Sequence, residues 1–255
     1  MTASTTDLAT HFERHVAVVE LRRPPSNFFD LELLTKLADT FDELQQTSEC
    51  RAVVLAAQGR VFCAGADFSE GSPDMDYPAQ LYAQAERLFA IGKPVVAAVQ
   101  GAAVGGGLGL ALAADFRIGC PEARFTANFA KLGFHPGFGL SFTLPRLIGV
   151  QKAALLMYTG RNVRGQEALD LGLVDELVPQ AEVLERSIAL ATEIAANAPL
   201  AVEATRQSIR GDFAAHLHAA VTREAMEQRK QFQSADFREG IAAAAARRAP
   251  VFFRR

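Results

Sequence analysis

The sequence predicts an α/β fold, in which a mostly parallel sheet is followed by a helical C-terminal region. In the first part of the chain, short and continuously apolar stretches alternate with segments of helical periodicity. Strands that are apolar on both faces are typical of parallel sheets, because parallel neighbours are joined by helices that cover them. Beyond Pro145 the pattern is almost entirely helical, which indicates a second, helical part of the fold.

Strands are predicted where apolar and β-branched residues run together between turn signals. Residues 15–21 (HVAVVEL), 51–57 (RAVVLAA) and 94–99 (PVVAAV) have this composition, which is typical of buried strands. Residues 115–120 (DFRIGC) add a further strand, and residues 173–178 (LVDELV) add a short one among the later helices. The alternation of these strands with helices favours parallel pairing.

Helices are predicted where apolar residues recur every three or four positions. Residues 31–44 carry leucines and Phe41 at this spacing, and Asp30 in front of them suits an N-cap. Residues 78–91 form a second amphipathic segment. The later helical segments are residues 151–158, 164–172, 181–198, 199–210 and 218–232.

Composition excludes several classes of protein. The net charge of the 255-residue chain is -3, which gives no basic footprint for nucleic acid, and the basic C-terminal RRAPVFFRR is interpreted as a solvated tail. The sequence shows neither a signal peptide nor an apolar run long enough to cross a membrane. Its three cysteines are widely spaced, which fits neither a disulfide framework nor a zinc site. We therefore expect a cytoplasmic protein without a metal and without contact with membranes or nucleic acid.

Glycines cluster in GAAVGGGLGLALAAD, residues 101–115. A dinucleotide fingerprint fails because Leu110 stands where its last glycine belongs, and a phosphate-binding loop fails because the lysine is missing. A strand, turn and helix remain, whose unpaired backbone N–H groups suit a negative oxygen. A second turn of this kind runs through Gly65 to Ala66, and two such donors could bracket one oxygen. A tight turn that only packs the helix onto the sheet is the alternative.

The chain resembles the crotonase, or enoyl-CoA hydratase/isomerase, family in several motifs that follow the family's order. The matching segments, which span nearly the whole chain, are RPPSN (23–27), VVLAAQGRVFCAGADFSE (53–70), KPVVAAVQGAAVGGGLGLALAADFRI (93–118), LPRLIG (144–149), ALDLGLVDELVP (168–179) and DFREGIAAAAARRAPVF (236–252).

The resemblance implies a crotonase-like spiral of ββα units over residues 1–195 and a helical trimerisation region over residues 196–255. It implies a homotrimer or a hexamer, and an acyl-CoA thioester as substrate, with coenzyme A as part of that substrate and no separate cofactor. The N–H groups of Ala66 and Gly106 would hold the thioester carbonyl as it becomes an oxyanion. Further substrate-binding residues would be Ala64, Asp67, Phe68, Gly105, Gly109, Phe129, Phe134 and Gly137, and coenzyme A would be bound by Arg23 and Arg248.

The sequence departs from the family at both catalytic glutamates of its hydratases. These positions fall on Gly109 and Phe129. Hydration needs one group to activate water and another to protonate the α-carbon, and neither glycine nor phenylalanine can do this. Isomerisation, decarboxylation, C–C cleavage and thioester hydrolysis pass through the same oxyanion, so they are expected in preference to classical hydration.

His135 is the main candidate for a relocated acid or base, because histidine exchanges protons near neutral pH. A turn histidine that hydrogen-bonds locally is the alternative. Weaker candidates follow the first oxyanion donor and are Asp67, Glu70, Asp74, Asp76 and Tyr77.

Phenylalanines gather around the proposed site, at positions 68, 129, 134, 138 and 142. They predict a pocket for a bulky apolar or ring-shaped acyl group, roomier and drier than a short-chain hydratase needs, although core packing would also explain them. Two other functions stay open at this point. One is a non-catalytic acyl-CoA-binding protein, and the other is a hydratase with relocated acid and base groups.

Overall fold

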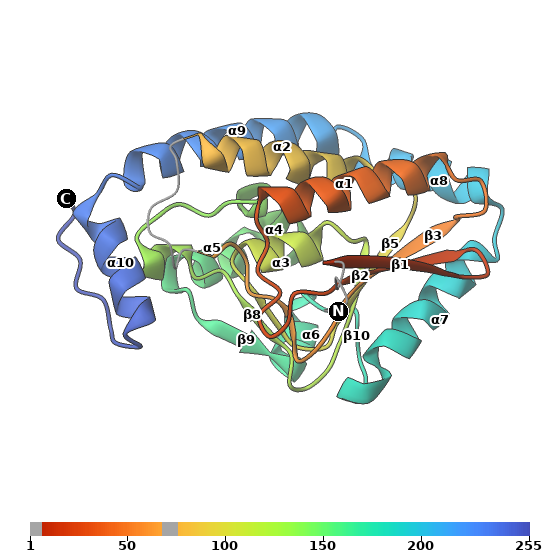
Figure 1. The fold of residues 1–255 in the computed structure, drawn as a ribbon, viewed down its shortest axis with the longest axis horizontal. Coiled ribbons are helices and arrows are strands. Elements are labelled where there is room, and N and C mark those ends of the chain that lie inside the picture. The colour runs from red at the N-terminus through yellow and green to blue at the C-terminus, as the bar shows by residue number, and fades with distance from the viewer. Residues whose placement is uncertain (1–6, 68–75) are drawn as a thin grey trace, which may run out of the picture.

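Two small sheets with helices around them form the protein (Figure 1). The structure is a computed structural model that describes residues 7–67 and 76–255. The first sheet has the order β1-β2-β3-β5-β7-β10 and the second the order β4-β6-β8-β9. The strands are β1 (Leu8–Glu13), β2 (Val16–Leu21), β3 (Ala52–Ala57), β4 (Val61–Cys63), β5 (Val95–Val99), β6 (Ala102–Val104), β7 (Phe116–Gly119), β8 (Arg124–Thr126), β9 (Asn162–Arg164) and β10 (Glu176–Leu177).

Consecutive strands alternate between the two sheets. β3, β5 and β7 are parallel neighbours in the first sheet, and β4, β6 and β8, which follow them in sequence, are parallel neighbours in the second. A helix then leads to the next pair, so each turn of the chain is a ββα unit. This arrangement confirms the crotonase-like α/β spiral that the sequence predicts.

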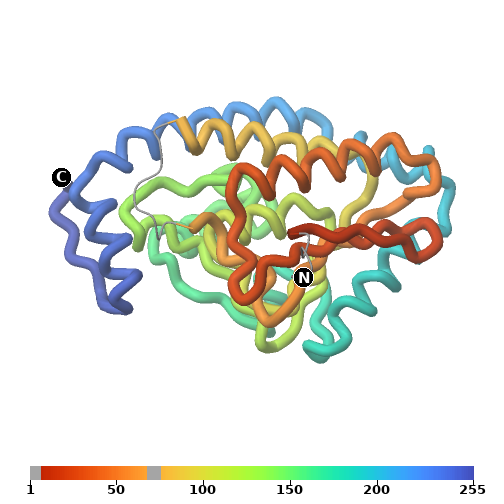
Figure 2. The backbone as a smooth tube through the Cα atoms, in the orientation of Figure 1, coloured from red at the N-terminus to blue at the C-terminus, as the bar shows by residue number. Residues whose placement is uncertain are grey.

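Helices cover the first sheet on both sides. α7 packs against β2, β3, β5 and β7, whereas α1 and α2 lie together on the other side, with α9 beside α2 (Figures 1 and 2). The helices are α1 (Leu31–Gln46), α2 (Tyr77–Ala90), α3 (Gly106–Leu112), α4 (Leu140–Ile148), α5 (Val150–Thr159), α6 (Gly165–Leu171), α7 (Val183–Ala195), α8 (Pro199–Arg210), α9 (Phe213–Gln231) and α10 (Ala235–Ala245), with 3-10 turns at Phe129–Leu132 and Gln180–Glu182.

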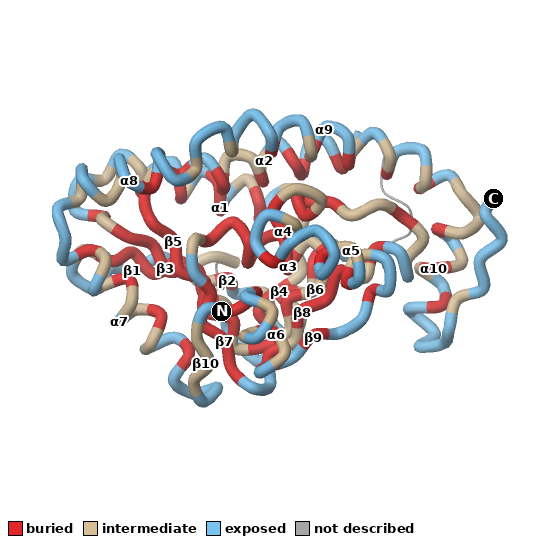
Figure 3. Tube along the Cα trace, turned by 180° about the vertical axis from the view of Figure 1, so that it is seen from behind, coloured by how far each residue is buried: buried red, intermediate tan, exposed pale blue. Residues whose placement is uncertain are grey.

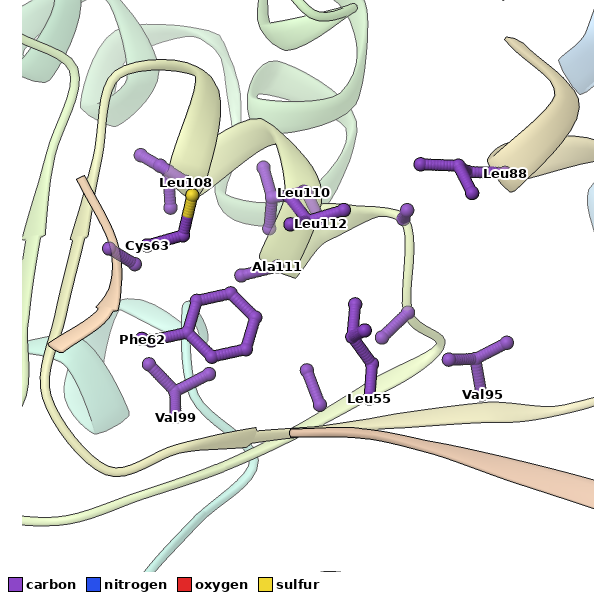
Figure 4. Close-up of a cluster of buried hydrophobic side chains, with 14 of the residues drawn as sticks. Leu55, Phe62, Cys63, Leu88, Val95, Val99, Leu108, Leu110, Ala111 and Leu112 are labelled. Atoms are coloured by element: carbon purple, nitrogen blue, oxygen red, sulfur yellow. The ribbon is translucent and has the colours of Figure 1, made fainter. Parts of the chain in front are cut away.

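The core lies between the strands and the inner faces of the helices. Figure 3 shows buried backbone along the strands and exposed backbone on the outer sides of α8, α9 and α10. In the close-up of Figure 4, Ala111 of α3 points toward Phe62, and Leu110 and Leu112 lie on other sides of the same helix. The glycine-rich stretch therefore leads into a short helix that is buried on all sides.

The predicted elements of the larger sheet and of the long helices are confirmed. Asp30 caps α1 as expected, since its carboxylate accepts a hydrogen bond from the N–H of Leu33 at 2.8 Å. β1 and the strands of the second sheet were not predicted, because most are only three residues long and carry no hydrophobic period. The predicted start of α9 at residue 218 was wrong, since the helix begins at Phe213.

Candidate active site

Two neighbouring strand ends bring Ala66 and Gly106 together. β4 and β6 are paired in parallel, and each ends just before one of these residues. Between them the backbones approach so closely that a β-carbon on Gly65 would lie 3.3 Å from the nitrogen of Gly106 and 2.8 Å from the carbonyl oxygen of Val104. Gly65 also has a φ of +89°, so both the space and the conformation at this position require glycine.

The N–H groups of Ala66 and Gly106 are available to a ligand. Neither group donates a hydrogen bond to any residue that the structure describes. Both residues line one cavity, whose water-accessible volume is about 70 Å³. The two predicted donors therefore meet at one cavity, as an oxyanion hole requires.

Several aromatic rings line the cavity. The phenylalanines that line it are Phe29, Phe129, Phe134, Phe138 and Phe232. Phe129 and Phe134 pack edge to face with their ring centroids 5.3 Å apart, a favourable arrangement for aromatic pairs. Polar side chains enter the lining only at Tyr77, Tyr82, Asn128 and Gln228. Among the described residues that line this cavity there is no carboxylate and no imidazole.

The two positions that correspond to hydratase glutamates are filled differently. The Phe129 ring lies against the glycines of the oxyanion site, since a β-carbon on Gly105 would lie 3.7 Å from its Cζ. Gly109 does not line the cavity, because Phe138 covers it. A β-carbon on Gly109 would lie 2.7 Å from Cβ and 2.8 Å from Cδ1 of Phe138. The expected enlargement of the pocket therefore does not occur at this position.

Phe138 is held in an unusual backbone conformation. Its φ is +61°, in the left-handed region that residues other than glycine rarely adopt. Its ring is buried and lies 5.4 Å from the ring of Phe29, which in turn lies against Gly106. Strain of this kind persists only where the surroundings fix the backbone, and here helix α9 supplies them.

One face of α9 holds the turn that carries Phe138. Gln231 accepts a hydrogen bond from the N–H of His135 at 2.6 Å, and Gln228 donates one to the carbonyl oxygen of His135 at 2.8 Å. Glu224 accepts hydrogen bonds from the N–H groups of Gly139 at 2.7 Å and Ser141 at 2.9 Å. The three α9 side chains are spaced so that they share a face of the helix.

Burial raises the pKa of Glu224 to about 7. The carboxylate is fully buried, and desolvation disfavours its charged form. The hydrogen bonds from Ser141 and Gly139 act in the opposite direction and lower the pKa, but they do not outweigh the burial.

Tyr82 and Gln228 form a buried polar pair inside the cavity. The Tyr82 hydroxyl donates a hydrogen bond to Oε1 of Gln228 at 2.8 Å. Burial raises the pKa of Tyr82 well above its ordinary value, so the phenol stays neutral. Neither residue is among those that the sequence predicts for the site. The position of Tyr82 beside Leu81 on the apolar face of a predicted helix could have marked it as buried, but nothing indicated its partner.

The structure places His135 outside the cavity lining. Its ring Nδ1 lies 2.7 Å from the carbonyl oxygen of Pro136. This is the local hydrogen bonding that the alternative interpretation expects. A catalytic function for His135 stays a prediction without support from this geometry.

The other predicted site residues divide into three groups. Ala64, Gly105, Phe134 and Gly137 line the cavity as expected, and so does Tyr77. Asp67 is exposed and does not line it, and Asp76 is also exposed, with Arg229 3.3 Å away. Phe142 lies away from the cavity, packed on Phe213. Phe68, Glu70 and Asp74 lie outside the described residues.

Both predicted coenzyme A ligands are already paired with carboxylates. Arg23 contacts Asp7 at 2.8 Å and Asp30 at 2.6 Å. Arg248 makes a two-pronged contact with Glu239, at 2.5 and 2.7 Å. These pairs do not line the cavity, so coenzyme A binding by these arginines remains a prediction.

Two structural features are absent from residues 7–67 and 76–255. Over these ranges no helix is long and apolar enough to cross a membrane. The same ranges contain no cluster of three or more histidine, cysteine, aspartate or glutamate side chains that could hold a metal ion.

Comparison with known proteins gives the family. Residues 11–255 match the enoyl-CoA hydratase/isomerase family. This chain belongs to that family. A probable enoyl-CoA hydratase of Bacillus subtilis is 34% identical over 94% of this chain and 96% of its own length. The 1,2-epoxyphenylacetyl-CoA isomerase of Escherichia coli is 31% identical over 96% of this chain and 97% of its own.

The fold agrees with solved members of the family. The crystal structure of an enoyl-CoA hydratase/isomerase from Pseudoalteromonas atlantica superimposes with a TM-score of 0.88 at 31% identity, covering 97% of this chain and all of the other. These relatives include both hydratases and an isomerase, so the family as a whole is enzymatic while the reaction of this member is open.

Proposed function

We propose that this protein is an acyl-CoA enzyme that stabilises a thioester enolate between the N–H groups of Ala66 and Gly106. The observation that carries the proposal is that two backbone donors, which bond to no described residue, line a largely apolar cavity. Backbone donors held in place in this way stabilise a developing oxyanion without reorganisation, and each is worth about 3 kcal/mol of the barrier.

The reaction is proposed to differ from classical hydration. Hydration and thioester hydrolysis both require a base that activates water, and isomerisation requires a base that removes a carbon-bound proton. The described lining offers two neutral phenols and two amides in place of a carboxylate. Decarboxylation needs only stabilisation of the enolate and a proton from solvent or a neutral acid, so it fits this lining with the fewest additions.

A substrate screen tests the proposal. The purified protein is incubated with crotonyl-CoA, a β,γ-enoyl-CoA, a 3-oxoacyl-CoA and methylmalonyl-CoA, and products are followed by mass spectrometry. We expect turnover of at least one ester other than crotonyl-CoA. Ala66→Pro removes one donor and should lower kcat/KM about 100-fold or more, whereas Ala66→Ser keeps the N–H group and should leave most of the activity. Efficient hydration of crotonyl-CoA would contradict the proposal.

A non-catalytic acyl-CoA-binding protein is the second candidate. The same lining without a carboxylate favours it. Tight binding of several acyl-CoA esters without turnover of any of them would support this function over the first.

We also propose the homotrimer or hexamer that the resemblance implies. Large apolar side chains are exposed on α8, where Leu200 is 81% and Ile209 is 71% exposed. Single exposed apolar side chains are normal at protein surfaces, so the resemblance carries this proposal. Light scattering of the purified protein would measure the assembly, and a monomer would contradict the prediction. A cytoplasmic location also remains a prediction, in keeping with the three free cysteines.

A further inference from the structure

Tyr82 and Gln228 are two polar side chains of the cavity lining that the proposed oxyanion site does not use. Both side chains line it, and both are almost completely buried, at 7% and 1% exposure. Burying a phenol and an amide is costly unless both are hydrogen-bonded, and an apolar pair would fill this space without that cost. The presence of this phenol and amide in a largely apolar wall therefore calls for an explanation.

The pair keeps unused hydrogen-bonding capacity. The amide is fixed at both ends, because Oε1 of Gln228 accepts from Tyr82 and its Nε2 donates to the carbonyl oxygen of His135. Nε2 carries two N–H donors, and the described residues accept from it only once. The backbone of Phe138 is close enough to lower the pKa of Tyr82, although burial outweighs it, and a phenol oxygen with two lone pairs keeps at least one acceptor position beside this group.

Two neighbouring rings connect the oxyanion site with the segment beside this pair. Phe29 lies against Gly106, where a β-carbon would lie 2.5 Å from its Cζ, and the ring centroid of Phe138 lies 5.4 Å from that of Phe29. The Tyr82 hydroxyl touches Gly137, the residue before Phe138. A ligand whose thioester carbonyl lies at Ala66 and Gly106 would therefore reach Tyr82 only with a part of the acyl group that is remote from the thioester.

We propose that Tyr82, with Gln228 as its positioning residue, recognises an oxygen substituent at the distal end of the acyl group. The inference rests on the proposed function and narrows it to ring-bearing acyl-CoA esters with a hydroxyl or similar group away from the thioester. Aromatic walls contact the ring, and the polar pair exchanges a hydrogen bond with the substituent. The recognition is selective because an unsubstituted ring gains nothing from the pair.

Binding measurements test this without requiring turnover. Dissociation constants of phenylacetyl-CoA, 3-hydroxyphenylacetyl-CoA and 4-hydroxyphenylacetyl-CoA are measured by calorimetry on the full chain. We expect at least one hydroxylated ester to bind about tenfold more tightly than phenylacetyl-CoA, the gain available from one good hydrogen bond. Tyr82→Phe removes only the hydroxyl. It should abolish the ratio of the phenylacetyl-CoA dissociation constant to that of the hydroxylated ester, while phenylacetyl-CoA still binds.

Three further variants complete the test. Gln228→Leu should reduce the ratio in the same direction, which keeps the inference testable if Tyr82→Phe folds poorly. Tyr158→Phe is the matched control, since this tyrosine is 81% exposed on α5, and it should leave the ratio unchanged. Loss of the ratio in Tyr77→Phe instead of Tyr82→Phe would overturn the assignment.

The remaining outcomes are also decisive. Equal binding of all three esters by the wild-type protein overturns distal recognition and leaves the proposed function standing. Failure of every ester to bind overturns the proposed function, and the inference falls with it.

Discussion

Phe138 lies directly over Gly109, and a β-carbon on the glycine would lie 2.7 Å from Cβ of the phenylalanine. Real Cβ atoms essentially never have a contact shorter than 3.0 Å of this kind. The family resemblance places a hydratase glutamate at position 109, so the change to glycine and the ring at 138 form one steric unit. The ring of Phe138 occupies the space that a side chain at position 109 would need.

The variant Gly109→Glu should therefore not create a hydratase. The new side chain would overpack the site, so we expect a loss of about 1–3 kcal/mol in the free energy of unfolding and no hydration of crotonyl-CoA. Combining it with Phe138→Gly should recover most of the stability, because position 138 has a φ of +61° that suits glycine. Urea unfolding and a crotonyl-CoA assay measure both effects. A single variant with wild-type stability would refute the steric coupling.

Glu224 should make the protein less stable as the pH rises. Its pKa is raised from 4.5 to about 7 in the fold, so the folded state binds this proton more tightly than the unfolded state does. The resulting stabilisation is complete below pH 4.5 and is lost as the pH rises through 7. A pKa difference of this size corresponds to about 3 kcal/mol.

The variant Glu224→Gln isolates this contribution. Unfolding free energies of the wild type and the variant are compared at about pH 4.5 and pH 8, on either side of the titration. The wild type should lose more stability than the variant between the two conditions. An identical pH dependence in both proteins would show that the carboxyl group does not titrate as described.

Asp115, at the end of the glycine-rich stretch, should act in stability and not in proton transfer. Its carboxylate accepts from the N–H of Val95 at 2.9 Å and contacts Arg206 at 2.8 Å and Arg210 at 3.1 Å. The variant Asp115→Asn leaves the buried guanidinium of Arg206 and the partly buried one of Arg210 uncompensated, so we expect a loss of about 3–5 kcal/mol. Asp39→Asn is the matched control, because its partner Arg87 lies at the surface and the loss should stay below about 1 kcal/mol. Equal losses of stability in Asp115→Asn and Asp39→Asn, measured by thermal or urea unfolding, would refute this structural role of Asp115.

The three thiols should be inert in the folded protein. Cys50, Cys63 and Cys120 are unpaired and at most 2% exposed, and burial raises the pKa of Cys63 to about 12. Thiolate, and not thiol, is the reactive form. A thiol reagent should therefore modify the protein only when urea is added, and then at all three positions. Rapid labelling under native conditions would show that one of these cysteines is accessible.

The sequence predicts the frame of the fold well and its fine structure poorly. β3, β5 and α1 are long, apolar and bounded by clear signals, so periodicity suffices to find them. β6 and β8 are three residues long, and their strand character comes from pairing with segments far away in the chain. No local pattern encodes such pairing.

The candidate site shows the same division. Ala66 and Gly106 could be predicted because backbone donors at strand ends leave a glycine signature. Gln228 could not, because it lies 146 residues from Tyr82 and an exposed-looking glutamine on a helix has many possible surroundings. His135 stays a prediction, since its residue type suits proton transfer while its ring Nδ1 lies 2.7 Å from the carbonyl oxygen of its neighbour Pro136.

Two distant stretches of the chain form the cavity together. One carries the oxyanion donors, and the other is the face of α9 that holds the turn from His135 to Ser141. The turn that lines the cavity near Phe138 is held by α9 side chains more than a hundred residues after Gly106. Substitutions on α9 would therefore change ligand preference without any change near the oxyanion donors.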